Sequence, residues 1–125
     1  TAISIEHQIP LILRRKEKKD YGTKRMVEGI FEKGQTCLII EDVVTSGASV
    51  FETAEALREE GLIVKDAAVF IDRDQGGASF LAKKGIELHS VFHLPGLIEE
   101  LLTDGLIDNH IAYETLNFLQ IHRSE

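Results

Sequence analysis

Two adjacent carboxylates and a hydroxyl-rich turn form the stretch of this sequence that is best suited to chemistry. Glu41 and Asp42 follow a short apolar run, and residues 45–49, Thr-Ser-Gly-Ala-Ser, come directly before a helical pattern. Such a turn can point successive backbone N–H groups at one anion, with the positive end of the following helix behind it. The two carboxylates can hold vicinal hydroxyls or a hydrated Mg²⁺. The stretch predicts a phosphosugar site, although residues of these types also cap helices.

Positive charge gathers in a second stretch. Residues 14–25 contain seven of the fourteen Lys and Arg residues of a chain whose net charge is −7. A run of charges is usually a solvated loop, but a local cationic patch on an acidic protein indicates an anionic small molecule. The overall acidity argues against a broad nucleic-acid surface, so no nucleic-acid partner is expected.

A third stretch, Asp-Arg-Asp-Gln-Gly-Gly at residues 72–77, follows another apolar run. Taken alone it is typical of an ordinary turn between a strand and a helix. An arginine can make paired hydrogen bonds to a carboxylate or a carbonyl group, a geometry that Lys cannot match. Without further information, however, the ordinary turn is the favoured interpretation of this stretch, and it gives Arg73 no particular role.

Strands that alternate with helices must position these three stretches. The apolar run 36–40 is predicted to be a strand buried on both faces of a parallel sheet. In the helix that follows, Val50, Ala54 and Leu57 share one face, and Gly61 is expected to end it. Alternation of this kind predicts an α/β fold, a mostly parallel sheet flanked by helices with right-handed crossovers. The expected strands are 9–13, 36–40, 67–71 and 86–92; the expected helices are about 48–60, about 79–84 and two between residues 94 and 123, separated near residues 104–105.

Size and composition set the outer limits. The 125 residues suffice for one domain, and no apolar run is long enough to span a bilayer, so no membrane association is expected. The single cysteine, Cys37, cannot form an internal disulfide, which favours a reducing, cytoplasmic location. Because the chain opens at Thr1 without a methionine and reaches a strand almost at once, we expect it to be N-terminally incomplete.

The three stretches together resemble one enzyme family. Ile-Ile-Glu-Asp-Val-Val-Thr-Ser-Gly at residues 39–47 is similar to the signature by which type I phosphoribosyltransferases bind 5-phosphoribosyl 1-pyrophosphate (PRPP). Arg-Lys-Glu-Lys-Lys-Asp-Tyr-Gly at residues 15–22 resembles the catalytic loop of orotate phosphoribosyltransferases, and the Arg73 turn resembles their base-binding turn. Residues 85–91 are similar to the orotate domain of animal UMP synthase. The resemblance implies that residues 1–125 form the C-terminal portion of a single phosphoribosyltransferase domain, a type I core that lacks its N-terminal part.

The resemblance also implies roles for individual residues. Lys19 and Asp42 would be catalytic. Lys16 would serve its own subunit, whereas Arg15, Lys19 and Tyr21 would reach into the partner's site across a homodimer with shared sites. Tyr21 stands where bacterial members have histidine. Arg73 and Thr45 would bind orotate. The implied PRPP-binding residues are Arg15, Lys16, Lys19, Tyr21, Glu41, Asp42, Val43, Val44, Thr45, Ser46, Gly47, Ala48 and Ser49.

The implied reaction is Mg²⁺-dependent transfer of phosphoribosyl from PRPP to orotate, which gives orotidine 5′-monophosphate and pyrophosphate in UMP biosynthesis. The Mg²⁺ would bind through PRPP and water near Glu41 and Asp42 rather than directly to the protein. An orotidine monophosphate decarboxylase, fused or separate, would act next. Two alternatives stay open: a phosphoribosyltransferase for purines or uracil, and a regulatory module that binds PRPP without turnover.

Overall fold

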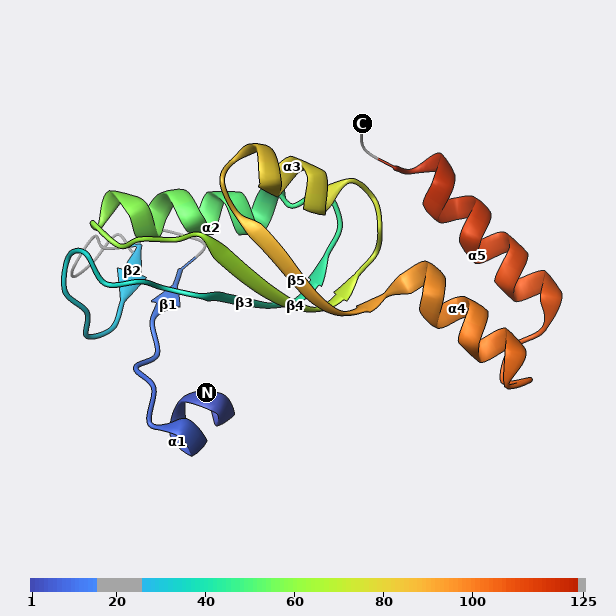
Figure 1. Cartoon of the computed structure of the whole chain (residues 1–125), viewed down its shortest axis with the longest axis horizontal. Helices are drawn as coiled ribbons and strands as arrows, with labels where there is room; N and C mark the ends of the chain where they lie inside the picture. The colour runs from blue at the N-terminus through green and yellow to red at the C-terminus, as the bar shows by residue number, and fades with distance from the viewer. Residues whose placement is uncertain (16–25, 124–125) are drawn as a thin grey trace.

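A three-stranded parallel sheet forms the centre of the protein. The computed structural model describes residues 1–15 and 26–123. Strands β3 (Ile39–Val44), β4 (Asp66–Asp72) and β5 (Glu87–His93) lie in the order β3-β4-β5. Helices α2 (Ala48–Glu59) and α3 (Gly77–Lys83) connect them and cover one face of the sheet (Figure 1). The predicted α/β fold with a parallel sheet is confirmed.

Helix α2 buries the face that its sequence pattern predicts. Val50, Ala54 and Leu57 are its buried residues and pack against the sheet in the hydrophobic core. The helix ends where expected, because Gly61 adopts a φ of 91° and the Leu62 N–H turns back to the carbonyl of Leu57 at 3.1 Å. Both strand connections thus meet in one hydrophobic core, formed by Val27, Ile39, Val44, Val50, Ala54, Leu57, Leu62, Val64, Ala67, Val69, Leu81 and Ile86.

The first strand of the sheet differs from its prediction in extent and in burial. β3 begins three residues later than residue 36 and continues to Val44, so the predicted boundary at residue 40 is wrong. The prediction that it is buried on both faces is also wrong, since Leu38 and Ile40 are 50% and 56% exposed. The physical reason is that α2 and α3 lie on the same face of the sheet (Figure 1).

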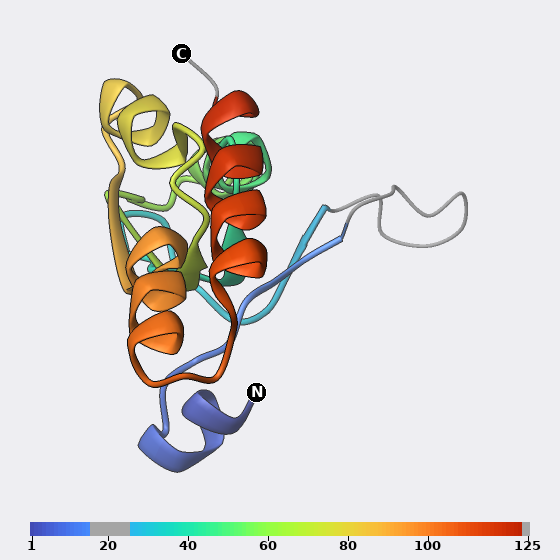
Figure 2. The ribbon, with the colours of Figure 1, turned by 90° about the vertical axis from the view of Figure 1, so that its right-hand side faces the viewer.

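The N-terminal part forms a short antiparallel hairpin after helix α1 (Ala2–His7). Its strands β1 (Leu13–Arg14) and β2 (Val27–Glu28) lie to one side of the parallel sheet (Figure 2), and Val27 is buried in the hydrophobic core. The strand predicted at residues 9–13 is therefore wrong except at its last residue, and β2 was not predicted. Ile9, Leu11 and Leu13 are all more than 40% exposed, so their apolar character does not reflect a buried strand.

Two helices complete the fold at the carboxyl end of the sheet. α4 (Leu94–Thr103) and α5 (Asn109–Ile121) pack against each other, as Figure 2 shows, and the predicted break near residues 104–105 is confirmed. The side chain of Asp108 caps α5 by accepting a hydrogen bond from the Ile111 N–H at 2.8 Å. Among the described residues, no helix has the length and apolar character needed to cross a membrane.

Candidate active site

The carboxyl ends of the three parallel strands meet at one edge of the sheet. The strand register pairs Val44 with Asp72, and Asp72 with His93. Open α/β sheets bind their ligands at this edge. Two of the three predicted stretches, residues 41–49 and the turn with Arg73, therefore lie next to each other in space.

Glu41 and Asp42 belong to β3 itself and do not follow it. Glu41 is half-buried and Asp42 is exposed, with Asp42 Oδ1 accepting a hydrogen bond from the Val43 N–H at 2.8 Å. Neighbouring side chains of a strand point to opposite faces, so the two carboxylates approach the edge from different sides. Their joint contact with one sugar stays a prediction.

The turn at residues 45–49 leaves the start of α2 open to a ligand. Gly47 is the N-cap residue, with a φ of 82°, and no side chain of residues 1–15 or 26–123 caps the helix there. The Phe51 N–H makes the first helical bond, to the Gly47 carbonyl at 3.0 Å. The earlier N–H groups have no partner within the helix, and among them the Ala48 N–H donates to Ser46 Oγ at 3.4 Å. These N–H groups and the helix dipole favour an anion at this point.

The turns at 45–49 and 72–77 pack directly against each other through two glycines. A Cβ atom on Gly77 would lie 2.6 Å from the carbonyl oxygen of Thr45 and 2.6 Å from Cγ1 of Val44. A Cβ atom on Gly47 would lie 3.0 Å from Cγ of Leu81. Only glycine allows this approach, which holds the turn at residues 45–49 against the start of α3. Sequence reasoning missed this role, and the Gly-Gly pair before a helix was its only signal.

Arg73 directly follows β4 in the sequence, and its backbone is hydrogen-bonded to β3. Its N–H donates to the Val44 carbonyl at 3.0 Å, and the residue is half-buried. The preceding Asp72 is 2% exposed, and its Oδ1 accepts from the Asp74 N–H at 2.9 Å. His93, which sequence reasoning left unassigned, places Nδ1 3.8 Å from the other carboxylate oxygen of Asp72.

The base of the N-terminal hairpin is attached to the side of α2. Arg14 donates to Thr53 Oγ1 at 3.1 Å and pairs with Glu52 at 3.4 Å. Arg15 pairs with Glu28 at 2.6 Å. The predicted loop residues Lys16, Lys19 and Tyr21 lie outside the described residues.

A second group of ionisable residues lies at the opposite, amino-terminal edge of the sheet. His89 Nε2 is 2.8 Å from Asp66 Oδ1, and ligand atoms of these two residues and Glu87 all lie within 4.8 Å of one another. The hydrogen bond to Asp66 raises the pKa of His89, and Glu87 adds to this effect. Sequence reasoning missed this group. It could have been found from the spacing of Glu87 and His89, because residues two apart in a strand share one face, and this face of β5 adjoins the start of β4.

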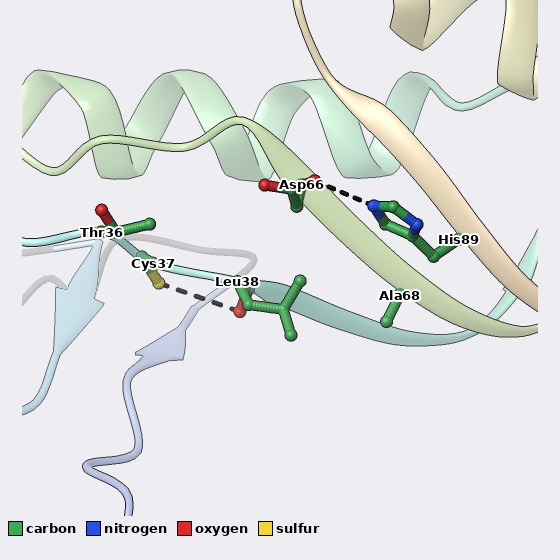
Figure 3. Close-up of a pocket in the computed structure, with 6 residues that line it drawn as sticks. All are labelled: Thr36, Cys37, Leu38, Asp66, Ala68 and His89. Atoms are coloured by element: carbon green, nitrogen blue, oxygen red, sulfur yellow. Dashed lines mark hydrogen bonds and ion pairs between the residues drawn. The ribbon is translucent and has the colours of Figure 1, made fainter.

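Beside this group lies a hollow of about 390 Å³ on the open side of the sheet (Figure 3). None of the predicted site residues that the structure describes lines it. Burial raises the pKa of the Cys37 thiol at its rim, and Cys37 packs against the core. The hollow is lined by Thr36, Cys37, Leu38, Asp66, Ala68 and His89.

Known proteins with similar sequences are named as uridine 5′-monophosphate synthases or orotate phosphoribosyltransferases. The chain is 62% identical over 120 residues to uridine 5′-monophosphate synthase of Bos taurus, covering 96% of the chain and 25% of that protein. It is 49% identical over 105 residues to orotate phosphoribosyltransferase of Chlamydia caviae, covering 82% of the chain and 51% of that protein. No protein-family model matches the chain. The chain is homologous to the orotate phosphoribosyltransferases.

Solved structures agree with this relationship. Leishmania donovani UMP synthase superposes with a TM-score of 0.83 at 34% identity, over 95% of the chain and 26% of that protein. A Mycobacterium tuberculosis orotate phosphoribosyltransferase in complex with PRPP superposes with a TM-score of 0.60 at 30% identity, over 69% of the chain and 48% of that protein. The chain thus has part of the type I phosphoribosyltransferase fold, and it spans about half the length of the orotate phosphoribosyltransferases it matches.

Proposed function

We propose that this chain carries the PRPP-binding and orotate-binding edge of an orotate phosphoribosyltransferase, which transfers phosphoribosyl from PRPP to orotate and releases pyrophosphate. One observation carries the proposal: the uncapped start of α2 and the Arg73 turn adjoin at the carboxyl edge, with the Arg73 N–H bonded to the Val44 carbonyl at 3.0 Å. That arrangement suits a phosphorylated sugar beside an anionic base. The names of the relatives support orotate over a purine or uracil.

The turn 45–49 would bind the 5-phosphate of PRPP. Its backbone N–H groups and the positive end of α2 stabilise negative charge without any cationic side chain. The hydroxyls of Thr45, Ser46 and Ser49 add further donors at the same turn. The predicted PRPP-binding residues from Val43 to Ser49 would therefore act chiefly through their backbone.

Glu41 and Asp42 would bind the ribose hydroxyls. Carboxylate oxygens are also the ligands that Mg²⁺ favours, directly or through water, so the residues at this edge fit the metal. When bound, Mg²⁺ neutralises charge on the pyrophosphate leaving group. As the bond to pyrophosphate breaks, the ribose ring gains positive character, which the nearby Asp42 carboxylate would stabilise electrostatically.

Arg73 would orient orotate for attack through its ring nitrogen N1. A guanidinium can hold the orotate carboxylate or a ring carbonyl with two parallel hydrogen bonds, and Thr45 stands across the edge from it. Because the ring nitrogen can react as an anion, the site needs no strong general base. This explains how a site built from carboxylates, backbone N–H groups and an arginine can perform the transfer.

The basic segment would close over the pyrophosphate, with Lys16 acting in its own subunit and Arg15, Lys19 and Tyr21 in that of a dimer partner. The contact of Arg14 with Thr53 of α2 supports this proposal. It places the first residue of the basic segment within about one helical turn of the turn 45–49. Arg15 would have to exchange its contact with Glu28 for the leaving group. Closure of such a loop excludes water and protects the activated sugar from hydrolysis.

Replacing Lys19 by alanine tests the segment. We expect turnover to fall about 100-fold or more with little change in PRPP affinity, because the ammonium group would stabilise charge that develops on the leaving group. Mixed dimers of Lys19→Ala and Asp42→Asn subunits should regain part of the activity if sites are shared. Unchanged turnover in Lys19→Ala would contradict the role of the segment, and inactive verified heterodimers would contradict sharing.

A decarboxylase must act on the product of this reaction, because orotidine 5′-monophosphate still carries the orotate carboxylate that UMP lacks. We propose that this decarboxylase belongs to the same polypeptide as the phosphoribosyltransferase or is a separate enzyme in the cytoplasm. Detection of UMP from PRPP and orotate in the full-length gene product would support the fused arrangement.

A base-selection assay tests the proposed function. The chain and the full-length gene product are each incubated with Mg²⁺ and PRPP, and loss of orotate is followed beside adenine, hypoxanthine and uracil. Consumption of orotate alone supports the proposal. Consumption of another base would show a different phosphoribosyltransferase, and PRPP binding without turnover in the full-length protein would show a regulatory module.

A further inference from the structure

The turn that contains Arg73 is bound by residues that are distant in the sequence, at the carboxyl end of α5. Gln75, which is 6% exposed, donates through Nε2 to the backbone carbonyl of His122 at 3.2 Å. Beside it, Arg123 Nη2 lies 3.2 Å from Asp74 Oδ1. Two consecutive residues after Arg73 thus contact two consecutive residues after α5.

The helix end offers a rigid acceptor to Gln75. The last four carbonyls of a helix have no partner within it, and His122 is the residue that caps α5. The ring of His122 is held by the preceding turn of α5, because its Nδ1 lies 2.8 Å from the Phe118 carbonyl and its ring stacks on that of Phe118 with centroids 4.0 Å apart. The Gln75 amide therefore satisfies an orphan carbonyl that cannot easily move away.

The turn itself depends on external support. Asp74 has a φ of 55°, a left-handed conformation that costs a non-glycine residue free energy. On the strand side, Asp72 accepts from the Asp74 N–H and the Arg73 N–H bonds to β3. On the other side, the contacts of Asp74 and Gln75 with α5 complete the support. The backbone of Arg73 is held between a strand end and a helix end.

We propose that Gln75 is a positioning residue for Arg73, through which the carboxyl end of α5 sets the affinity for orotate. The proposal rests on the proposed function, since it takes Arg73 as the orotate ligand. Loss of the Gln75 amide would leave the His122 carbonyl unpaired and release the turn on one side. Gln75 would not touch orotate itself.

The test compares Gln75→Leu with Gln120→Leu in the full-length protein. Gln120 is an exposed residue of the same helix, so its replacement by leucine is the matched control. For Gln75→Leu we expect the KM for orotate to rise about tenfold, with the KM for PRPP and kcat within about twofold of the unsubstituted protein. Simple loss of folded protein would lower the apparent kcat and leave both KM values unchanged. An orotate KM equal to that of Gln120→Leu would overturn the proposal.

Hydrogen exchange gives a second readout that needs no activity. In Gln75→Leu, exchange should accelerate in residues 73–76 and 119–123 and stay unchanged in α4. Unchanged exchange in both segments, or a uniform increase along the chain, would overturn the link between α5 and the turn. If the unsubstituted protein does not convert orotate, the proposed function fails on its own, and exchange still decides whether α5 supports the turn.

Discussion

The two edges of one parallel sheet are built differently. At the carboxyl edge, Asp72 and Gln75 are 2% and 6% exposed, and Gly77 leaves no room for a methyl group. At the amino-terminal edge, the side chains of His89 and Asp66 are 52% and 45% exposed beside an open hollow. Both edges carry charged side chains, but only at the carboxyl edge are these side chains held in place by tight packing of the backbone around them.

This difference separates a site that depends on geometry from a cluster of surface charges. Transfer chemistry requires that two substrates are positioned with a precision of about 1 Å or better, which backbone contacts secure better than exposed side chains do. The carboxyl edge meets this requirement through the contacts of residues 44–47 with residues 73–77. Changes at that edge should therefore have much larger effects than changes at the amino-terminal edge.

The substitution Gly77→Ala should have the largest effect. Its Cβ would lie 2.6 Å from the Thr45 carbonyl oxygen, so the two turns must separate. We expect the free energy of unfolding to fall by about 3 kcal/mol and PRPP affinity to be lost, as measured by urea denaturation and calorimetry. Gly96→Ala in α4 is the control, because nothing lies within 4 Å of its Cβ position. Equal stability of the two variants would contradict the close packing.

Arg73→Lys separates the effect of charge from that of geometry at the carboxyl edge. The substitution keeps the positive charge and removes only the planar guanidinium with its paired hydrogen bonds. The KM for orotate should rise about 10- to 100-fold, which corresponds to about 1.4–2.7 kcal/mol. The KM for PRPP should stay unchanged in the same assay, since the turn 45–49 would bind the phosphate separately. An unchanged orotate KM would remove Arg73 from the base site.

Asp42→Asn should have a moderate effect at the same edge. The asparagine oxygen can still accept from the Val43 N–H, so the fold should be retained while the charge near the ribose and Mg²⁺ is lost. We expect PRPP affinity to fall about tenfold by isothermal titration. Asp104→Asn at the far end of α4 is the matched control, and equal affinities of the two variants would argue against the ribose contact.

Asp66→Asn at the amino-terminal edge should have the smallest effect. The hydrogen bond to Asp66 raises the pKa of His89, so the substitution should return that pKa toward its ordinary value in an NMR titration. A raised folded-state pKa means that the pair stabilises the fold below the ordinary imidazole pKa, and that this contribution is lost as pH rises through the raised value. Turnover should not change, and a large loss would mean that this edge takes part in the reaction.

Local signals in the sequence predicted much of the fold. The periodicity of Val50, Ala54 and Leu57 and the helix-ending Gly61 define α2 within a few neighbouring residues, and the structure confirms them. The extension of β3 to Val44 was not predicted, because acidic residues at a sheet edge remain solvated within a strand. The two-residue strand β2 is too short to leave a periodic pattern.

The site was predictable only in part, for a related reason. Glu41 and Asp42 were recognisable because they follow an apolar run that predicts a strand, whereas Arg73 received a role only through the resemblance of its turn to the base-binding turn of orotate phosphoribosyltransferases. The contacts that support them are non-local: Gly77 meets Thr45, and Gln75 meets His122 across 47 residues of sequence. Such contacts arise from the packing of whole elements, which no single stretch of sequence encodes.

A crystal structure with orotidine 5′-monophosphate tests the central claim most directly, because the proposed product contains both the 5-phosphate and the base. The account predicts the phosphate at the backbone N–H groups of residues 46–49 and the orotate carboxylate at Arg73. Binding of the nucleotide in the hollow beside Asp66 and His89, or with its base away from Arg73, would contradict it.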